Sequence, residues 1–463
     1  MAAQKFFFIG SGFVCGIIIA AFYSLSFVTF YLIALTTFVA SAILFQRYLF
    51  LVSLGLIGLF LGILYFDLRS DYLNAGYPKD GSGSFEVIAK SESQITDRSQ
   101  RFSARFEGGY SGDVLVFYSA DERVLYGQRF KVEGEFESAE RPGSLPVIFV
   151  NDLKVSGIRS GGLGRQLHDF KVSLVDVLIR NLSPRSGALA AGLLLGEKAN
   201  FDADFKEAMR RSGTTHIVAL SGYNISVLVG ALAFLVSAFR RRTRMILYII
   251  SIVFFTLMVG AEPSIVRAAI MGGLFLISKE FGRDIPPGYA LVFAGLGMLL
   301  WNPMYVYSVG FQLSFLSFAG IVYLMPAISV FLKIKNSLFS NLVLESGSAQ
   351  LAVLPLVVGY FGGFSMLAIL ANILILWAVP IAMFFTFCLL VFNFIFPPIV
   401  FFVNWICEII LGYQIMIIDL FSKLYIPSGE SFKSGLFVAV YVFVVLAFII
   451  INRQDKIDEP NQA

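Results

Sequence analysis

Charged residues are scarce in this chain of 463 residues. Asp, Glu, Lys and Arg make up 14% of it and hydrophobic residues 57%, whereas soluble domains carry roughly 25% charged residues. This composition excludes an ordinary soluble domain and predicts a polytopic helical membrane protein. The formal net charge of +4 is small for the length, so it argues neither for nor against nucleic acid as a partner.

Cysteine and histidine are also rare. The three cysteines, Cys15, Cys388 and Cys407, all lie in apolar runs, so no disulfide framework is implied. With two histidines and no Cys-x-x-Cys pair, we expect neither a metal site nor a cofactor. The sequence has no Gly-x-x-x-x-Gly-Lys loop, which would cradle nucleotide phosphates. Energy for any transport must therefore come from elsewhere.

Hydropathy divides the chain into five parts. Residues 1–66 predict three transmembrane helices, because the apolar run is too long for a removable signal peptide. Residues 67–160 hold most of the charge and predict an inserted small all-β domain, a sandwich or a barrel. Amphipathic and interfacial helices are expected over 161–212, a polytopic helical domain over 213–452, and a cytoplasmic tail over 453–463.

Five alternating runs separated by turn signals predict the strands of the β domain. They are residues 85–89, 101–106, 114–118, 129–136 and 147–154. In the second run, the period of two places Arg101 and Arg105 on one face and two phenylalanines on the other. The arginine face is either a solvated surface over a core or a surface that contacts phosphates.

Residues 163–182 predict an amphipathic helix that lies along the membrane surface. Its apolar stripe consists of Leu163, Leu167, Phe170, Leu174, Val177 and Leu178. Ser183 and Pro184 are typical of the cap and first residue of a further helix. Beyond residue 214 we expect roughly eight to ten apolar segments, with 364–396 forming one long helix or two short ones.

The basic loops predict the orientation, since Lys and Arg are enriched on the cytoplasmic side. The β domain then lies outside the cytoplasmic membrane and the chain re-enters it over residues 214–239. The basic positions expected in the cytoplasm are Lys5, Arg47, Arg240, Arg241, Arg242, Arg244, Lys279, Arg283, Lys333, Lys335, Arg453 and Lys456.

Polar residues interrupt several apolar segments, where they are costly and rarely face lipid. Glu262 and Arg267 could instead pair with each other, and Ser221 and Asn224 could form hydrogen bonds between helices; His216 could cap a helix at the outer interface. The candidates for a polar path are His216, Ser221, Asn224, Glu262, Arg267, Gln312, Ser314 and Gln350.

An intramembrane serine hydrolase would need a histidine base close to Ser221. His216 lies five residues away and points about 140° from Ser221 on a regular helix. The other histidine, His168, lies in the surface helix. The geometry argues against this enzyme, and we expect no catalytic residue.

Residues 213–225, Gly-Thr-Thr-His-Ile-Val-Ala-Leu-Ser-Gly-Tyr-Asn-Ile, resemble the signature helix of ComEC-type competence proteins, the inner-membrane DNA channels of natural transformation. Supporting segments follow the family's order. They are Gly-Leu-Leu-Leu-Gly-Glu at 192–197, Ser-Ile-Val-Arg-Ala-Ala at 264–269, Asn-Pro at 302–303, Gly-Phe-Gln-Leu-Ser-Phe at 310–315 and Ala-Gln-Leu-Ala-Val-Leu-Pro at 349–355.

The resemblance implies an oligonucleotide-binding (OB-like) barrel at 67–160, of the kind that grips strands with basic and aromatic side chains. Two features depart from the family. Asn224 stands where the signature has a second histidine, and a short polar tail stands where many members have a metallo-β-lactamase-like domain. We therefore expect no nuclease activity in this chain.

These features favour a channel for single-stranded DNA across the cytoplasmic membrane, working with a separate DNA receptor and a cytoplasmic ATPase motor. A separate nuclease is a further candidate partner, and membrane lipid surrounds the helices. The alternative is a transporter of another polyanion or a small solute, for which a narrow, neutral cavity would be diagnostic. The third hypothesis is the intramembrane serine hydrolase.

Overall fold

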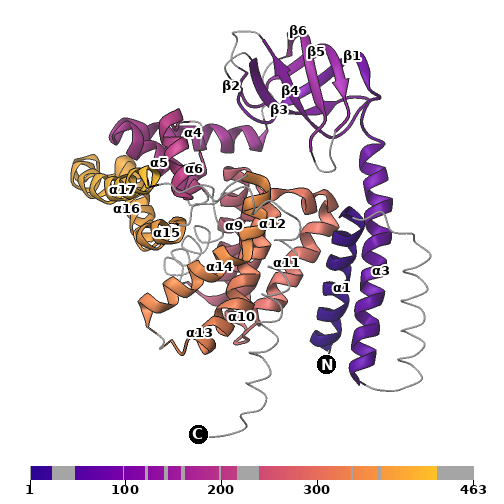
Figure 1. Ribbon diagram of the computed structural model, residues 1–463. Coiled ribbons are helices and arrows are strands. Elements are labelled where there is room, and N and C mark those ends of the chain that lie inside the picture. The colour runs from indigo at the N-terminus through magenta and orange to yellow at the C-terminus, as the bar shows by residue number, and fades with distance from the viewer. Residues whose placement is uncertain are drawn as a thin grey trace, which may run out of the picture. The chain divides into compact units, whose positions relative to one another are not determined.

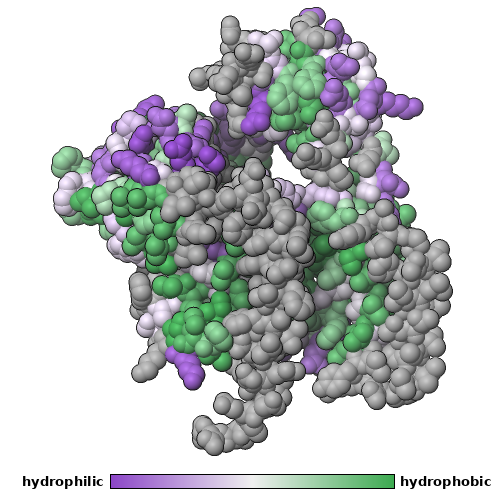
Figure 2. All heavy atoms as spheres, viewed as in Figure 1, coloured by the Kyte–Doolittle hydropathy of each residue, from purple (hydrophilic) through white to green (hydrophobic). Residues whose placement is uncertain are grey.

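A computed structural model describes residues 2–22, 47–96, 99–119, 124–139, 144–157, 162–197, 200–215, 239–334, 337–361 and 367–424. It has two compact units, one built from residues up to Phe170 with Val292–Phe311, the other from Lys171–Leu291 and from Gln312 onward. Among the described residues, seven helical segments are long and apolar enough to span a membrane. In Figure 2 hydrophobic residues cover much of the visible helical surface that is not grey, while the β domain shows both hydrophilic and hydrophobic residues. The predicted fold class, a helical membrane protein with an inserted barrel, is confirmed.

Helices α1 (Ala2–Phe22) and α3 (Arg47–Asn74) of the first unit lie side by side (Figure 1). Glycines let their backbones touch, since a β-carbon at Gly12, Gly16, Gly58 or Gly62 would collide with the opposite helix. Small residues commonly provide the closest approach between membrane helices, where no hydrophobic effect drives association. Replacing these glycines would therefore force the two helices apart.

Six strands follow, and five of them overlap the five predicted runs. The six strands are β1 (Gly81–Ala89), β2 (Gln94–Thr96), β3 (Ser99–Glu107), β4 (Asp113–Tyr118), β5 (Arg129–Glu137) and β6 (Val147–Gly157). The sheet order is β1-β5-β6-β4-β3-β2, and an additional β1–β3 pairing closes five of the strands into a barrel (Figure 1). All pairings are antiparallel except β4–β6, which is parallel. Only the three-residue β2 escaped the sequence pattern, because it is too short to show a period.

The barrel core follows from strict alternation along its strands. In β5 every second residue is buried and every intervening one is exposed, so Phe130, Val132 and Phe136 point inward while charged residues face outward. The other inward side chains are Phe85, Val87, Ala89, Phe102, Ala104, Phe106, Val114, Val116, Tyr118, Val124 and Ile148. The barrel thus encloses a hydrophobic core of its own.

The remaining elements are helical. They are α4 (Leu163–Asn181), α5 (Pro184–Leu195), α6 (Ala203–Ser212), α9 (Arg241–Val259), α10 (Pro263–Glu280), α11 (Pro287–Trp301), α12 (Val309–Ala319), α13 (Met325–Phe331), α14 (Leu338–Phe361), α15 (Ala368–Leu376), α16 (Val379–Ile395) and α17 (Val400–Lys423), with one-turn segments η1 (Pro303–Tyr307), η2 (Gly320–Leu324) and η3 (Pro397–Ile399). Residues 364–396, predicted as one helix or two, contain the two helices α15 and α16.

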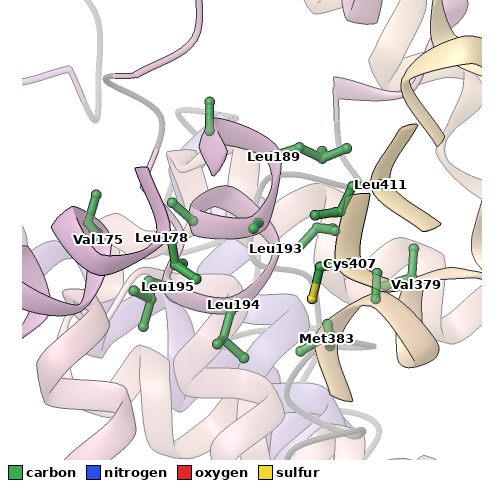
Figure 3. Close-up of a cluster of buried hydrophobic side chains, with 14 of the residues drawn as sticks. Val175, Leu178, Leu189, Leu193, Leu194, Leu195, Val379, Met383, Cys407 and Leu411 are labelled. Atoms are coloured by element: carbon green, nitrogen blue, oxygen red, sulfur yellow. The ribbon is translucent and has the colours of Figure 1, made fainter. Parts of the chain in front are cut away.

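Helix α5 lies in the core of the second unit. Ten of its residues are buried, and Figure 3 shows Leu189 and Leu193 pointing toward Cys407 and Leu411 of α17. Because α5 is buried around most of its circumference, it needs neighbours on several sides. Helices α4, α16 and α17 provide them.

Part of the predicted apolar stripe of α4 packs inside the protein, and its position along a membrane surface stays a prediction. Leu167, Leu174 and Leu178 are buried, whereas Leu163 and Phe170 are exposed. Leu174 and Leu178 belong to the core around α5. Packing against a neighbouring helix buries the apolar stripe, and this satisfies the same 3.6-residue pattern that a membrane surface would satisfy.

Glu408 of α17 caps the start of α5. Its carboxylate accepts hydrogen bonds from Ser183 N at 2.5 Å, Ser183 Oγ at 3.0 Å and Ser186 Oγ at 2.8 Å. Pro184 occupies the first turn as predicted, but the Ser183 side chain makes no capping bond within its own helix. A carboxylate from another helix therefore takes over the capping role and also favours the positive end of the α5 dipole.

We predict that Glu408→Ala lowers the free energy of unfolding by on the order of 2 kcal/mol, because hydrogen bonds to a charged group are lost together. Glu408→Gln keeps one acceptor oxygen and should lose less. Thermal melting in detergent measures both. Asp176→Asn, an exposed change on α4, is the control, and equal melting of all three variants and the parent would contradict the capping role.

Candidate functional site

A row of side chains crosses the outer face of the barrel. The strand register places Arg101 of β3 beside Phe117 of β4, and Phe117 beside Phe149 of β6. The two phenylalanine rings stack, with centroids 5.7 Å apart and planes 27° from parallel. The Phe149 side chain is 45% exposed. Phe117 is half-buried and Phe149 is exposed, so the ring pair forms an apolar spot on the outer face and is a candidate contact surface.

The two predicted arginines of β3 differ in their surroundings. Arg105 donates to Asp113 at 2.7 Å and 3.3 Å, and Lys90 donates to the same carboxylate at 2.8 Å. Arg101 is exposed, and no described residue forms an ion pair with it. Only Arg101 therefore presents an uncompensated charge beside the aromatic pair.

Asp113 has an altered pKa for this reason. Its partial burial acts to raise the pKa, but hydrogen bonds from Arg105 and Lys90 outweigh burial and hold the pKa below its usual value. The same pair raises the pKa of Arg105. Asp113 thus stays ionised and keeps Arg105 occupied.

The other end of the row is acidic. Glu135 of β5 is the neighbour of Phe149, and Glu133 and Glu137 are exposed on the same strand face. A polyanion on the row would therefore place its phosphates toward Arg101 and away from β5.

A second polar group surrounds Arg267 of α10, whose side chain is 5% exposed. Its Nε donates to Ser314 Oγ of α12 at 2.7 Å, and one terminal nitrogen lies 3.5 Å from Met271 Sδ. The guanidinium carbon is 5.2 Å from the Phe318 ring centroid and 5.9 Å from that of Phe315. The structure thus brings Arg267 and Ser314, both predicted from sequence, into contact.

Glu262, the expected alternative partner of Arg267, forms no ion pair with it among the described residues. Glu262 instead precedes Pro263 at the start of α10. Gln312 accepts a hydrogen bond from the Tyr360 hydroxyl at 2.9 Å. Gln350 of α14 has a buried side-chain oxygen without a hydrogen-bond partner.

Other buried polar side chains in the second unit also lack partners. Both polar atoms of Asn372 and of Gln414, and the Ser348 hydroxyl, are buried and unbonded. Each such group costs about 1–3 kcal/mol, so these positions need an explanation beyond packing. Gln414 was missed at the sequence level, although an amide within the apolar run 400–423 is the same signal that identified Gln350.

His216, Ser221 and Asn224 lie outside the described residues, as does the tail from residue 425. The described approach to that segment ends at Thr215. Gly213 ends α6 with φ of 71°, a left-handed conformation that suits glycine. A β-carbon at Gly213 would also meet Ala368.

The polar groups of the described residues are suited to binding. Among the described residues, no cluster of three or more His, Cys, Asp or Glu side chains could hold a metal ion. The guanidinium groups, hydroxyls and amides can donate or accept hydrogen bonds without proton transfer.

A family model described as competence protein matches residues 193–456. The match covers more than half of the chain and includes the Arg267 group and the unbonded amides. The chain belongs to the competence protein family. The resemblance seen in the sequence is thereby confirmed.

A curated relative is similar to part of this chain. ComE operon protein 3 of Bacillus subtilis (strain 168) is 30% identical over 212 residues. The matched residues make up 45% of this chain and 26% of the relative. The chain therefore spans about a quarter of the relative's length. No solved structure matches the chain.

We predict that Asp113→Asn removes an acid-sensitive contribution to barrel stability. A depressed carboxyl pKa stabilises the fold above the unfolded value of about 3.9, and this stability is lost as pH falls through the folded pKa. Unfolding temperature of the full chain measured from pH 7 down to pH 3 should fall in the parent and change less in the variant. Glu135→Gln, an exposed change on β5, is the control, and parallel curves for parent and Asp113→Asn would contradict the assignment.

Proposed function

We propose that this competence protein is a membrane channel that passes single-stranded DNA into the cytoplasm during natural transformation. The observation that carries the proposal is the family match over residues 193–456. That match coincides with the part of the chain where polar side chains are buried among candidate membrane spans. Buried polar groups in membrane helices mark substrate pathways more often than lipid-facing surfaces.

The path in this proposal has two parts. The barrel lies outside the cytoplasmic membrane and receives the strand on Arg101, Phe117 and Phe149, since stacked rings and a free cation suit unpaired bases and a phosphate. Within the membrane, the strand passes His216, Ser221, Asn224, Glu262, Arg267, Gln312, Ser314 and Gln350. Arg267 and His216 contact phosphates, and the neutral groups supply hydrogen bonds.

The channel works with partners in this proposal. A receptor delivers DNA, a cytoplasmic ATPase motor supplies the energy, and a separate nuclease removes the second strand where one is present. The chain itself is not an enzyme. A transporter of a small solute would not need aromatic rings beside a cation on its barrel. We therefore rank the transporter below the DNA channel.

Deleting the gene in a transformable host should abolish internalisation of DNA while leaving DNA bound at the cell surface, because only the membrane crossing is lost. Uptake of labelled DNA into a nuclease-resistant fraction measures internalisation. Restoring the gene on a plasmid is the control. Unchanged transformation in the deletion strain would remove the proposal.

Changes in the aromatic row should weaken binding of single strands by the full chain in nanodiscs. Phe149→Ala removes a stacking ring, and stacking is worth about 1–3 kcal/mol per base, so the dissociation constant should rise by on the order of tenfold. Arg101→Gln should reduce the slope of log K against log salt by about 0.7, the value for one phosphate contact on a single strand.

Arg105→Gln is the matched control for Arg101→Gln, since Asp113 already occupies Arg105. It should leave the salt slope close to that of the parent. Fluorescence anisotropy of a labelled oligothymidylate measures both quantities. Equal slopes for the two arginine variants would show that the row does not contact phosphate.

A further inference from the structure

Arg267 is a buried cation that has no anionic partner among the described residues. Its side chain is 5% exposed, and its contacts are the Ser314 hydroxyl, the Met271 sulfur and the faces of Phe315 and Phe318. None of these groups is negatively charged, and no described residue places a carboxylate within ion-pair distance of Arg267. By contrast, Arg244 of α9 forms an ion pair with Glu280 of α10 at 2.5 Å.

The missing charge matters because a guanidinium remains protonated at every physiological pH. Buried charges are retained in proteins when they are paired or when they bind something. The ring faces attract the cation but accept no conventional hydrogen bond along its edge. A guanidinium has five N–H donors, and Ser314 accepts only one of them.

Ser314 adds a donor of its own. Its oxygen accepts from Arg267 Nε, and no described residue accepts its proton. A hydroxyl and the terminal N–H groups of a guanidinium can together bind two oxygens of one anion.

We propose that Arg267 and Ser314 form a binding site for a phosphodiester anion within the membrane part of the chain. Two non-esterified oxygens of a phosphodiester match the planar guanidinium fork, which a spherical ion does not. The identification of this phosphodiester as the backbone of the transported strand rests on the proposed function. The headgroup of a phospholipid offers the same chemistry.

The test uses the full chain in phosphatidylcholine nanodiscs. An abasic oligomer of ten phosphodiester units supplies phosphates without bases, and a methylphosphonate oligomer of equal length is uncharged. All proteins also have the Arg101→Gln change, so that the barrel does not mask the result. The apparent dissociation constant is read from the rise in unfolding temperature with oligomer concentration, since a ligand that binds the folded state stabilises it.

The chain with native Arg267 should be stabilised by the phosphodiester oligomer and not by the methylphosphonate. Arg267→Lys keeps the charge but loses the fork, and should bind at least tenfold more weakly. Arg267→Gln should lose the stabilisation. Arg283→Gln, an exposed arginine just beyond α10, removes the same charge and should bind like the native chain.

Unfolding temperatures without ligand show whether a variant folds, and Arg267→Lys tests the site even if Arg267→Gln does not fold. Native mass spectrometry from nanodiscs containing phosphatidylglycerol provides the lipid arm. Loss of a retained lipid in Arg267→Lys, without any oligomer effect, would support the site with a headgroup as its occupant. Equal oligomer binding and equal lipid retention in native and Arg267→Lys proteins would overturn the site. That result would leave the DNA-uptake phenotype of the deletion strain, and so the proposed function, untouched.

Discussion

Hydrocarbon offers no water to a polar group, so a charge buried among membrane spans needs a partner inside the protein. Glu408 of α17 has such partners in Ser183 and Ser186, which it binds at the start of α5. Arg244, which is expected at the cytoplasmic side, pairs with Glu280, and this pair joins α9 to α10. Among the described residues Arg267 has a hydroxyl, a sulfur and two ring faces around it but no carboxylate, which supports the binding role proposed for it.

The barrel obeys the opposite constraint, because water can solvate its outer charges without help. On the barrel, the role of a charged side chain depends on whether it already has an ion-pair partner. Asp113 holds Arg105 and Lys90, and its depressed pKa keeps it ionised. Arg101 has the same residue type and the same strand face but no such partner. Strand alternation predicts that Arg101 and Arg105 lie on the same face. Only Arg105 has an ion pair with Asp113 of the neighbouring strand β4.

The sequence predicted elements well wherever one face of an element is buried. The five longer strands and the helix at 163–182 follow from hydrophobic periods, and β2 did not because three residues show none. The period of α4 did not reveal that part of its stripe packs against α5, since a membrane surface and a neighbouring helix require the same stripe. The signature residues His216, Ser221 and Asn224 remain predictions, because they lie outside the described residues.

Pairings across the chain could not be read from periodicity. Glu408 and Ser183 are 225 positions apart, and Arg267 and Ser314 are 47 apart. Local pattern identifies each as a polar residue in an apolar run but does not choose its partner. From the sequence, Glu262 was a possible partner of Arg267, whereas in the structure Arg267 donates a hydrogen bond to Ser314.

In the proposed function, the two candidate contacts would recognise different parts of the same polymer. Ring faces such as Phe117 and Phe149 accept any base, since every base has a flat face, and a guanidinium such as Arg267 accepts any phosphodiester. Neither contact reads the donor and acceptor pattern by which one base differs from another. A path built from such contacts would distinguish unpaired strands from duplex, whose bases are stacked on each other, but would pass all sequences alike. Glu135 beside Phe149 adds an asymmetry, because its charge would repel phosphates from that end of the row and favour the end with Arg101.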